Sequence, residues 1–326
     1  MLPMGVESLD RRARSGGLSR DATQTRNESS RAYFSARAYQ KGMCLTSMLD
    51  ARGLPLREFF ESRLPNCKEM QKSWNTCGVP LIVPVEPVAW TLVGAAFDYR
   101  VRYLFTITRP ERFVAALGAG QEFEVPFANL ASQLAQFTSN NHPCGALMSP
   151  SAEAELARFC YVLAMYESLF RAAVVNSPLF SLGAKASADE QLALAPPPAV
   201  ADLVALTGAA VAAMGHLFKK SMISNPVFAG SLDVGGADAD LIINRCLIDI
   251  KTTKNRSLDR RTAYQLVGYL LLDYENQYRI NSLGFYLSRI PALIVWPVDE
   301  AIAIMSNGHE TVSSLRNGLK VFLARM

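Results

Sequence analysis

Residues 239–251 read ADLIINRCLIDIK, and this stretch decides the fold. It holds two short apolar runs separated by only Asn244 and Arg245, which is the spacing of a two-residue β-hairpin turn. Asparagine suits such a turn because it tolerates the left-handed backbone conformation that the turn requires. When the residues that flank the turn pair with each other, Asp240 lies directly opposite Asp249. The stretch therefore predicts a hairpin that brings two carboxylates together.

The charged side chains of this hairpin are expected to project from one face of the sheet. Side chains two apart on a strand share a face, and the same register places Asp238 opposite Lys251. Opposed side chains have Cβ atoms about 5 Å apart, so the carboxylates of Asp240 and Asp249 destabilise the pair unless a cation offsets them. Mg²⁺ suits this position because it binds one or two carboxylates together with water and phosphate oxygens. With a lysine present to orient or activate a water, the pattern indicates hydrolysis of phosphodiester bonds.

The same residues also fit a site that binds no metal. Asp240 would then be solvated at a strand end, while Asp249 would form an ion pair with Lys251 or Arg245. A single Asp-x-Lys in a strand is typical of such a solvated sheet face. The combination of a glycine-rich approach, a short hairpin and Asp-x-Lys at the end of the second strand favours the metal site.

The motif residues resemble the PD-(D/E)XK nuclease superfamily, the restriction-endonuclease-like fold, and especially its RecB-like branch. Asp240 matches the first acidic position, residues 249–251 match the (D/E)xK element, and residues 265–269 (QLVGY) match the Q-x-x-x-Y helix motif. The resemblance covers residues 225–298. One departure is Ala239, which stands where the family motif names a proline.

The resemblance implies which residues hold the metal and which assist the reaction. Asp240, Asp249 and the main-chain carbonyl of Ile250 are the expected ligands of Mg²⁺ or Mn²⁺. Lys251 is expected to assist the attacking water. No cysteine follows Cys246, so the iron-sulfur cluster of some RecB-like nucleases is not expected here.

Two further features of the family concern helices. Gln265 and Tyr269 lie one helical turn apart and share a face, which could point at the active site or at the DNA backbone. An acidic or histidine side chain on an upstream helix often completes the site. Glu167 is the candidate for that metal ligand, with His216 in reserve, because each lies on an expected helix before the core.

The pattern of elements along the chain predicts an α/β fold. After the hairpin, a helix is expected at residues 262–278. Strand-like runs follow it at residues 283–288 and 292–298. We therefore expect a restriction-endonuclease-like core, with a mixed sheet flanked by helices, after a mainly helical N-terminal region. Further helices are expected at residues 88–105, 151–173, 200–220 and 313–324. The expected organisation is a disordered basic arm at 1–38, the helical region at 39–180, an Ala/Pro-rich linker or loop at 181–200, and the nuclease-like core at 201–326.

Composition sets only broad limits on partners and location. The chain has 326 residues, a formal net charge of +4 and a hydrophobic content of 50%, which permits a nucleic-acid partner without requiring one. Its six cysteines form no C-x-x-C pair, and its three histidines show no ligand spacing. The apolar run at 203–218 is shorter than the roughly 18 residues that a membrane span needs, so no membrane association is expected. We expect a cytoplasmic protein. The basic loop after the hairpin could contact phosphates or could be an ordinary solvated loop; its charged residues are Lys254, Arg256, Arg260 and Arg261.

The expected function is that of a Mg²⁺-dependent nuclease, with DNA as its substrate. An alternative from a different class keeps the fold without catalysis, as a nucleic-acid-binding or assembly module. A third, a nucleotide-sugar transferase, is suggested by Asp238-Ala-Asp240. In that class the Asp-x-Asp follows an apolar strand, whereas here it precedes one, so this alternative ranks lowest.

Overall fold

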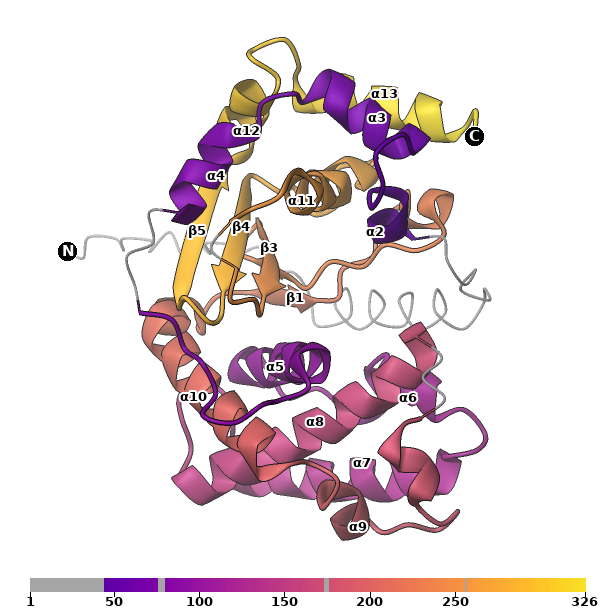
Figure 1. The fold of residues 1–326 in the computed structure, drawn as a ribbon, viewed down its shortest axis with the longest axis vertical. Coiled ribbons are helices and arrows are strands. Elements are labelled where there is room, and N and C mark those ends of the chain that lie inside the picture. The colour runs from indigo at the N-terminus through magenta and orange to yellow at the C-terminus, as the bar shows by residue number, and fades with distance from the viewer. Residues whose placement is uncertain (1–43, 76–79, 173–175, 256) are drawn as a thin grey trace, which may run out of the picture.

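A computed structural model describes residues 44–75, 80–172, 176–255 and 257–326. Over these residues the fold is α/β, with a five-stranded mixed sheet between two layers of helices (Figure 1). The arm expected at 1–38 and Arg256 of the basic loop lie outside the described residues.

The elements follow one another in a long helical stretch and then a mixed stretch. The α-helices are α2 Leu45–Met48, α3 Pro55–Arg63, α4 Lys68–Asn75, α5 Trp90–Phe105, α6 Ala115–Ala119, α7 Glu124–Asn141, α8 Pro150–Ala172, α9 Ala188–Leu192, α10 Pro197–Met214, α11 Arg260–Leu272, α12 Val298–Met305 and α13 Val312–Leu323. Short 3-10 helices are η1 Pro110–Arg112, η2 Pro178–Ser181, η3 Gly215–Leu217 and η4 Ser231–Val234. The strands are β1 Met222–Ser224, β2 Leu241–Ile243, β3 Cys246–Lys251, β4 Ser282–Leu287 and β5 Ala292–Pro297.

The predicted hairpin is confirmed with its register. Ile243 pairs with Cys246 and Leu241 with Ile248, so extension of the ladder by one residue sets Asp240 against Asp249. Both turn residues, Asn244 and Arg245, have positive φ values of 47° and 68°. Positive φ at both central positions is the signature of a type I′ turn, whose twist matches that of the flanking strands.

The sheet runs in the order β1-β2-β3-β4-β5. All neighbouring strands are antiparallel except β3 and β4, which are parallel and are joined through α11. A parallel pair requires such a crossover, because its second strand must start again from the same end of the sheet. The crossover places α11, which carries the Q-x-x-x-Y motif, on the sheet face next to the carboxyl end of β3.

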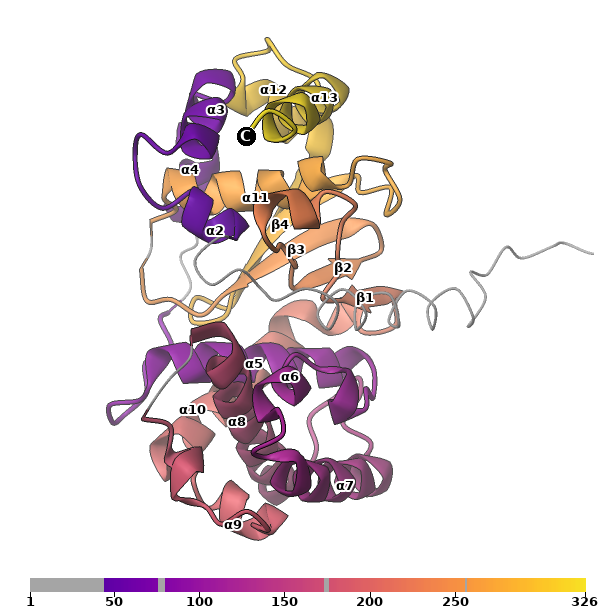
Figure 2. The same cartoon turned by 90° about the vertical axis from the view of Figure 1, so that its right-hand side faces the viewer.

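The two faces of the sheet enter two different hydrophobic clusters. Ile248 and Ile250 of β3 pack into a cluster formed mainly by α5 to α10. Leu247 lies on the opposite face, in a cluster with α2 to α4 and α11 to α13. Alternation along the strand produces this division, because successive side chains point to opposite faces. We call residues 90–217 the helical lobe, and residues 44–75 with 222–323 the sheet lobe; Figure 2 shows the contact between them.

The packing divides the chain differently from the expected domain boundaries. Helices α2 to α4 precede the helical lobe in sequence but pack within the sheet lobe. Helix α10, expected to begin the nuclease-like core, lies against α5 and α8 instead. Its Asp202 forms a buried 2.6 Å ion pair with Arg289, which follows β4. The two lobes are therefore joined by a buried charge pair as well as by apolar packing.

The segment 181–200, expected to be a linker or loop, is structured in part. It contains α9, which Ser187 caps, and the first turn of α10. The prolines at 196–198 stand at the start of α10, because proline fits the first helical turn, where no main-chain donor is needed. Side chains of Ala188, Gln191 and Leu192 are buried.

Helix α10 also starts earlier than the apolar run at 203–218 suggested. Together with η3 it spans Pro197–Leu217, and by length and composition alone this stretch could cross a membrane. Within the fold, 39% of the most apolar 18 residues of this stretch is buried, and the helix contacts α5 and α8.

Candidate active site

The predicted carboxylate pair lies at the open end of the hairpin, where Asp240 precedes β2 and Asp249 lies near the end of β3. Asp240 Oδ2 accepts a 2.6 Å hydrogen bond from the main-chain N–H of Ile250, and the Asp240 carbonyl accepts one from Asn225. These two bonds fix the side chain and the backbone of Asp240 beside the segment that carries Asp249. Burial and the charge of Asp249 raise the pKa of Asp240 to about 7. The ionised pair is therefore electrostatically unfavourable in the free protein, as the register predicted.

Lys251 lies at the same site and carries a positive charge. Its Nζ atom is 2.7 Å from Asp249 Oδ2. That oxygen is buried, and no described residue gives it a hydrogen bond of good geometry, so the contact is an ion pair. Burial acts to lower the pKa of Lys251, but the neighbouring Asp249 outweighs it and raises the pKa. Lys251 is thus an ammonium group that can orient an anion or a water, and it is a poor proton acceptor.

The Q-x-x-x-Y helix makes direct contact with this lysine. Gln265 Oε1 accepts a 3.1 Å hydrogen bond from Lys251 Nζ, and Gln265 Nε2 donates to the Tyr269 hydroxyl at 2.8 Å. The same amide donates to Thr46 of α2 at 3.2 Å. Close approach of α2 is possible because Gly268 has no side chain; a Cβ atom there would lie 3.0 Å from a Leu45 methyl carbon. Both motif residues line the cavity and belong to a hydrogen-bonded chain that ends at Lys251.

Helix α5 supplies a third carboxylate that sequence reasoning missed. Asp98 lines the same cavity as Asp240, and its pKa is raised well above the ordinary value by burial and by the charge of Asp240. No hydrogen bond or ion pair joins its carboxylate to a described residue. The available signal was its position as the single acidic residue in the apolar stretch 88–105. No pattern in that stretch indicates which face of the helix packs on the sheet.

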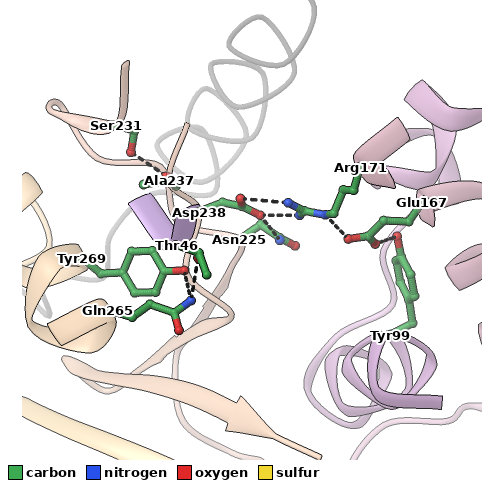
Figure 3. Close-up of polar contacts among 10 residues, drawn as sticks. All are labelled: Thr46, Tyr99, Glu167, Arg171, Asn225, Ser231, Ala237, Asp238, Gln265 and Tyr269. Carbon is green, nitrogen blue, oxygen red and sulfur yellow. Dashed lines mark hydrogen bonds and ion pairs between the residues drawn. The ribbon is translucent and has the colours of Figure 1, made fainter. Parts of the chain in front are cut away.

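Glu167, the sequence-based candidate for the upstream ligand, lines the cavity but is already engaged. One of its oxygens accepts a hydrogen bond from the Tyr99 hydroxyl, and Oε1 lies 2.5 Å from Arg171 Nε (Figure 3). Asp98 is therefore the better placed of the two for a metal ligand. The reserve candidate, His216, is exposed in η3 and does not line the cavity.

Asp238 does not pair with Lys251, and this expectation is wrong. The regular strand β2 begins only at Leu241, and Asp238 forms an isolated bridge with Val227. Its carboxylate makes a 2.8 Å ion pair with Arg171 from the helical lobe. Burial acts to raise the pKa of Asp238, but Arg171 outweighs it and lowers the pKa. Figure 3 shows the resulting chain of polar contacts across the two lobes.

The basic loop is partly used within the protein. Lys254 lies over the Trp90 ring, 4.3 Å from its centroid, and Arg261 forms an ion pair with Asp50. These contacts tie the loop to α5 and to the segment after α2, so its charges are not all available to a ligand.

Asp240 and Asp98 line a cavity of about 660 Å³ between the lobes, whereas Asp249 and Lys251 lie behind Asp240 and are not among its lining residues. Its walls come from α2, α5, α8, the segment before β2, and α11. The lining residues are Cys44, Leu45, Thr46, Asp98, Arg102, Glu167, Phe170, Arg171, Asn225, Gly236, Ala237, Asp238, Asp240, Gln265 and Tyr269.

The residues fit a hard divalent cation bound partly by solvent. Among the residues that the structure describes, no three His, Cys, Asp or Glu side chains already form a metal cage. Mg²⁺ does not need one, since one or two carboxylates plus waters and phosphate oxygens are its usual ligands in enzymes. The raised pKa of Asp240 is what a site would show when its ligands repel each other without a cation.

No model of a known protein family, no curated protein sequence and no solved structure matches this chain. The resemblance to nucleases therefore rests on the motif residues and on their arrangement in the fold.

Proposed function

We propose that this protein is a metal-dependent nuclease that hydrolyses phosphodiester bonds, with DNA as its expected substrate and Mg²⁺ or Mn²⁺ as its cofactor. The observation that carries the proposal is the position of Asp240, one residue beyond the β2–β3 ladder and hydrogen-bonded to Ile250 between Asp249 and Lys251. A solvated sheet face does not account for this arrangement, because Asp249 is only 3% exposed.

The residues divide the expected chemistry between them. Asp240 and Asp249 would hold the cation, with Asp98 as the further carboxylate, and the main-chain carbonyl of Ile250 stays a predicted ligand. When bound, a divalent cation stabilises negative charge on phosphate oxygens and lowers the pKa of a coordinated water. The Lys251 ammonium donates hydrogen bonds to the water or to the phosphate, and Gln265 holds that ammonium in place.

The nuclease proposal is tested by cleavage assays with two substitutions that remove different parts of the site. We expect Asp249→Ala and Lys251→Ala each to abolish Mg²⁺-dependent cleavage of linear, circular or single-stranded DNA. Lys219→Met is the matched control, because Lys219 is exposed at the end of the helical lobe. Circular dichroism checks that each variant is folded. Cleavage that persists in both site variants would contradict the proposal.

The alternative of a non-catalytic nucleic-acid-binding module is favoured by one observation. Lys251 is paired with Asp249, which could stabilise the fold without a metal. Calorimetric titration with Mg²⁺ separates the two functions. A nuclease takes up the ion through its carboxylates, whereas a binding module with this ion pair gives no heat of binding and cuts no DNA.

A further inference from the structure

Arg102 lines the cavity and forms no ion pair with any residue that the structure describes. It lies on α5, one helical turn after Asp98, and its side chain is only 4% exposed. Its guanidinium lies over the Tyr99 ring, 5.0 Å from the centroid, and 6.0 Å from the centroid of Phe113. These rings hold the flat face of the group and leave its N–H edge for other partners.

That edge has no partner within the described part of the chain. Arg102 Nε and Nη1 are both buried, and neither donates a hydrogen bond. Buried donors without acceptors are destabilising, and guanidinium groups taken out of water are usually paired. The buried Arg100 and Arg289 follow this rule, since each makes two hydrogen bonds to one carboxylate.

The carboxylates of the cavity do not fill this role. Glu167 and Asp238 are both engaged by Arg171. Asp98 and Asp240 line the cavity with Arg102, yet neither forms an ion pair with it in the described ranges. Arg102 therefore lines the cavity with two donors, Nε and Nη1, that no described residue accepts from.

We propose that Arg102 binds a phosphate group of the nucleic-acid strand that enters the cavity. The proposal rests on the nuclease function proposed above and names what the helical lobe contributes to it. A planar guanidinium matches two phosphate oxygens with two parallel hydrogen bonds. A cavity of about 660 Å³ has the size of a pocket for a single small ligand. The bound segment is therefore an unpaired strand or strand end, and a duplex stays outside.

Equilibrium binding without metal tests this proposal. The probe is a short fluorescein-labelled single-stranded oligothymidylate, and its fluorescence anisotropy is measured in EDTA at several salt concentrations. We expect Arg102→Met to weaken binding about tenfold, a typical loss for one charge-assisted phosphate contact. The slope of log K against log salt should shrink by about 0.7, the value for one phosphate contact on a single strand. Arg102→Lys should keep the slope and lose part of the affinity, because it retains the charge without the fork.

Arg158→Met is the matched control, since it removes one positive charge from α8 where Arg158 pairs with Glu155 at the surface. It should leave the affinity within about twofold of the wild type, as an exposed charge contributes little. Thermal unfolding without the probe separates binding from a structural role. A binding arginine with orphaned donors predicts that Arg102→Met is at least as stable as the wild type.

The outcomes separate this proposal from the nuclease function. Wild-type protein that binds the strand but never cuts it, with weaker binding by Arg102→Met, supports the role of Arg102 and rejects the nuclease. Arg102→Met that is folded and binds with the wild-type affinity and salt slope overturns the role of Arg102, whatever the cleavage assay shows. Absence of any strand binding by the wild type overturns it as well. A melting temperature that falls in both Arg102 variants would assign Arg102 a structural role instead.

Discussion

The main-chain N–H of Ile250 donates a 2.6 Å hydrogen bond to the side chain of Asp240. This bond holds an acidic side chain from the end of one strand beside the segment that joins Asp249 to Lys251. It stabilises a position that the charge of Asp249 disfavours. Burial and the charge of Asp249 nevertheless raise the pKa of Asp240 to about 7, while the bond from Ile250 acts to lower it.

The raised pKa predicts that the metal-free protein loses stability as the pH rises. Between about pH 4 and pH 7 the folded protein keeps a proton on Asp240 that the unfolded chain releases, so the free energy of unfolding falls across this window. Asp240→Asn keeps a hydrogen-bond acceptor for Ile250 and carries no charge. In EDTA at about pH 8 it should raise the free energy of unfolding by on the order of 1 kcal/mol, with little change at about pH 4. Urea unfolding at several pH values measures this, and identical pH slopes for the two proteins would rule out the raised pKa.

Asp98 and Glu167 are predicted to differ in their effect on metal binding. Asp98→Asn should weaken Mg²⁺ binding at least about tenfold, because it removes an unengaged carboxylate from the cavity that Asp240 lines. Glu167→Gln should change Mg²⁺ affinity by less, since Arg171 and the Tyr99 hydroxyl already occupy this carboxylate. Calorimetric titration of both variants gives the comparison. A larger loss of Mg²⁺ affinity in Glu167→Gln than in Asp98→Asn would show that Glu167, the candidate from the sequence, is the upstream ligand.

Gln265 is predicted to be a positioning residue for Lys251. Gln265→Met removes its hydrogen bond to the ammonium and should lower kcat about tenfold, as expected for a hydrogen bond to a charged group. KM should change less, because the side chain acts through Lys251. Tyr269→Phe removes only the hydroxyl that accepts from Gln265 Nε2, so its effect on kcat should be smaller. Steady-state cleavage kinetics measure both, and an unchanged kcat in Gln265→Met would show that Lys251 needs no such support.

The buried pair of Asp202 and Arg289 is predicted to join the lobes. Both side chains are at most 1% exposed, so Asp202→Ala leaves an uncompensated guanidinium in the interior. We expect the free energy of unfolding to fall by about 3–5 kcal/mol in urea denaturation. Glu155→Ala breaks the surface pair with Arg158 and should lower it by no more than about 1 kcal/mol. Similar losses of unfolding free energy in the two variants would mean that the interlobe pair stabilises the fold no more than a surface pair does.

Local signals explain the parts of the fold that the sequence predicted correctly. The hairpin was confirmed because period-two patterning and a two-residue turn together leave one register for β2 and β3. Helix α11 and strands β4 and β5 were confirmed because each carries a clear pattern within its own length. Strand β1 was missed because it has only three residues, all of them half-buried, and pairs with β2 across a long intervening loop.

Long-range packing explains the parts that the sequence did not reveal. The partner of Asp238 is Arg171 of α8, and no pattern near either residue indicates that they meet. Helices α2 to α4 precede the helical lobe in sequence, yet they cover α11 through buried side chains such as Leu45 and Phe60. The boundary between the lobes was misplaced for the same reason, because hydrophobic side chains do not state which partner they pack against.

By itself, the sequence determined that Asp240 and Asp249 oppose each other and that Gln265 and Tyr269 share a helix face. Strand alternation and helical periodicity fix these relationships over a few residues, without reference to the rest of the chain. Only the tertiary structure decided that Asp98 and Arg102 of α5 face the same cavity. That outcome depends on which face of a largely apolar helix packs on the sheet, and complementary packing of the two lobes settles it.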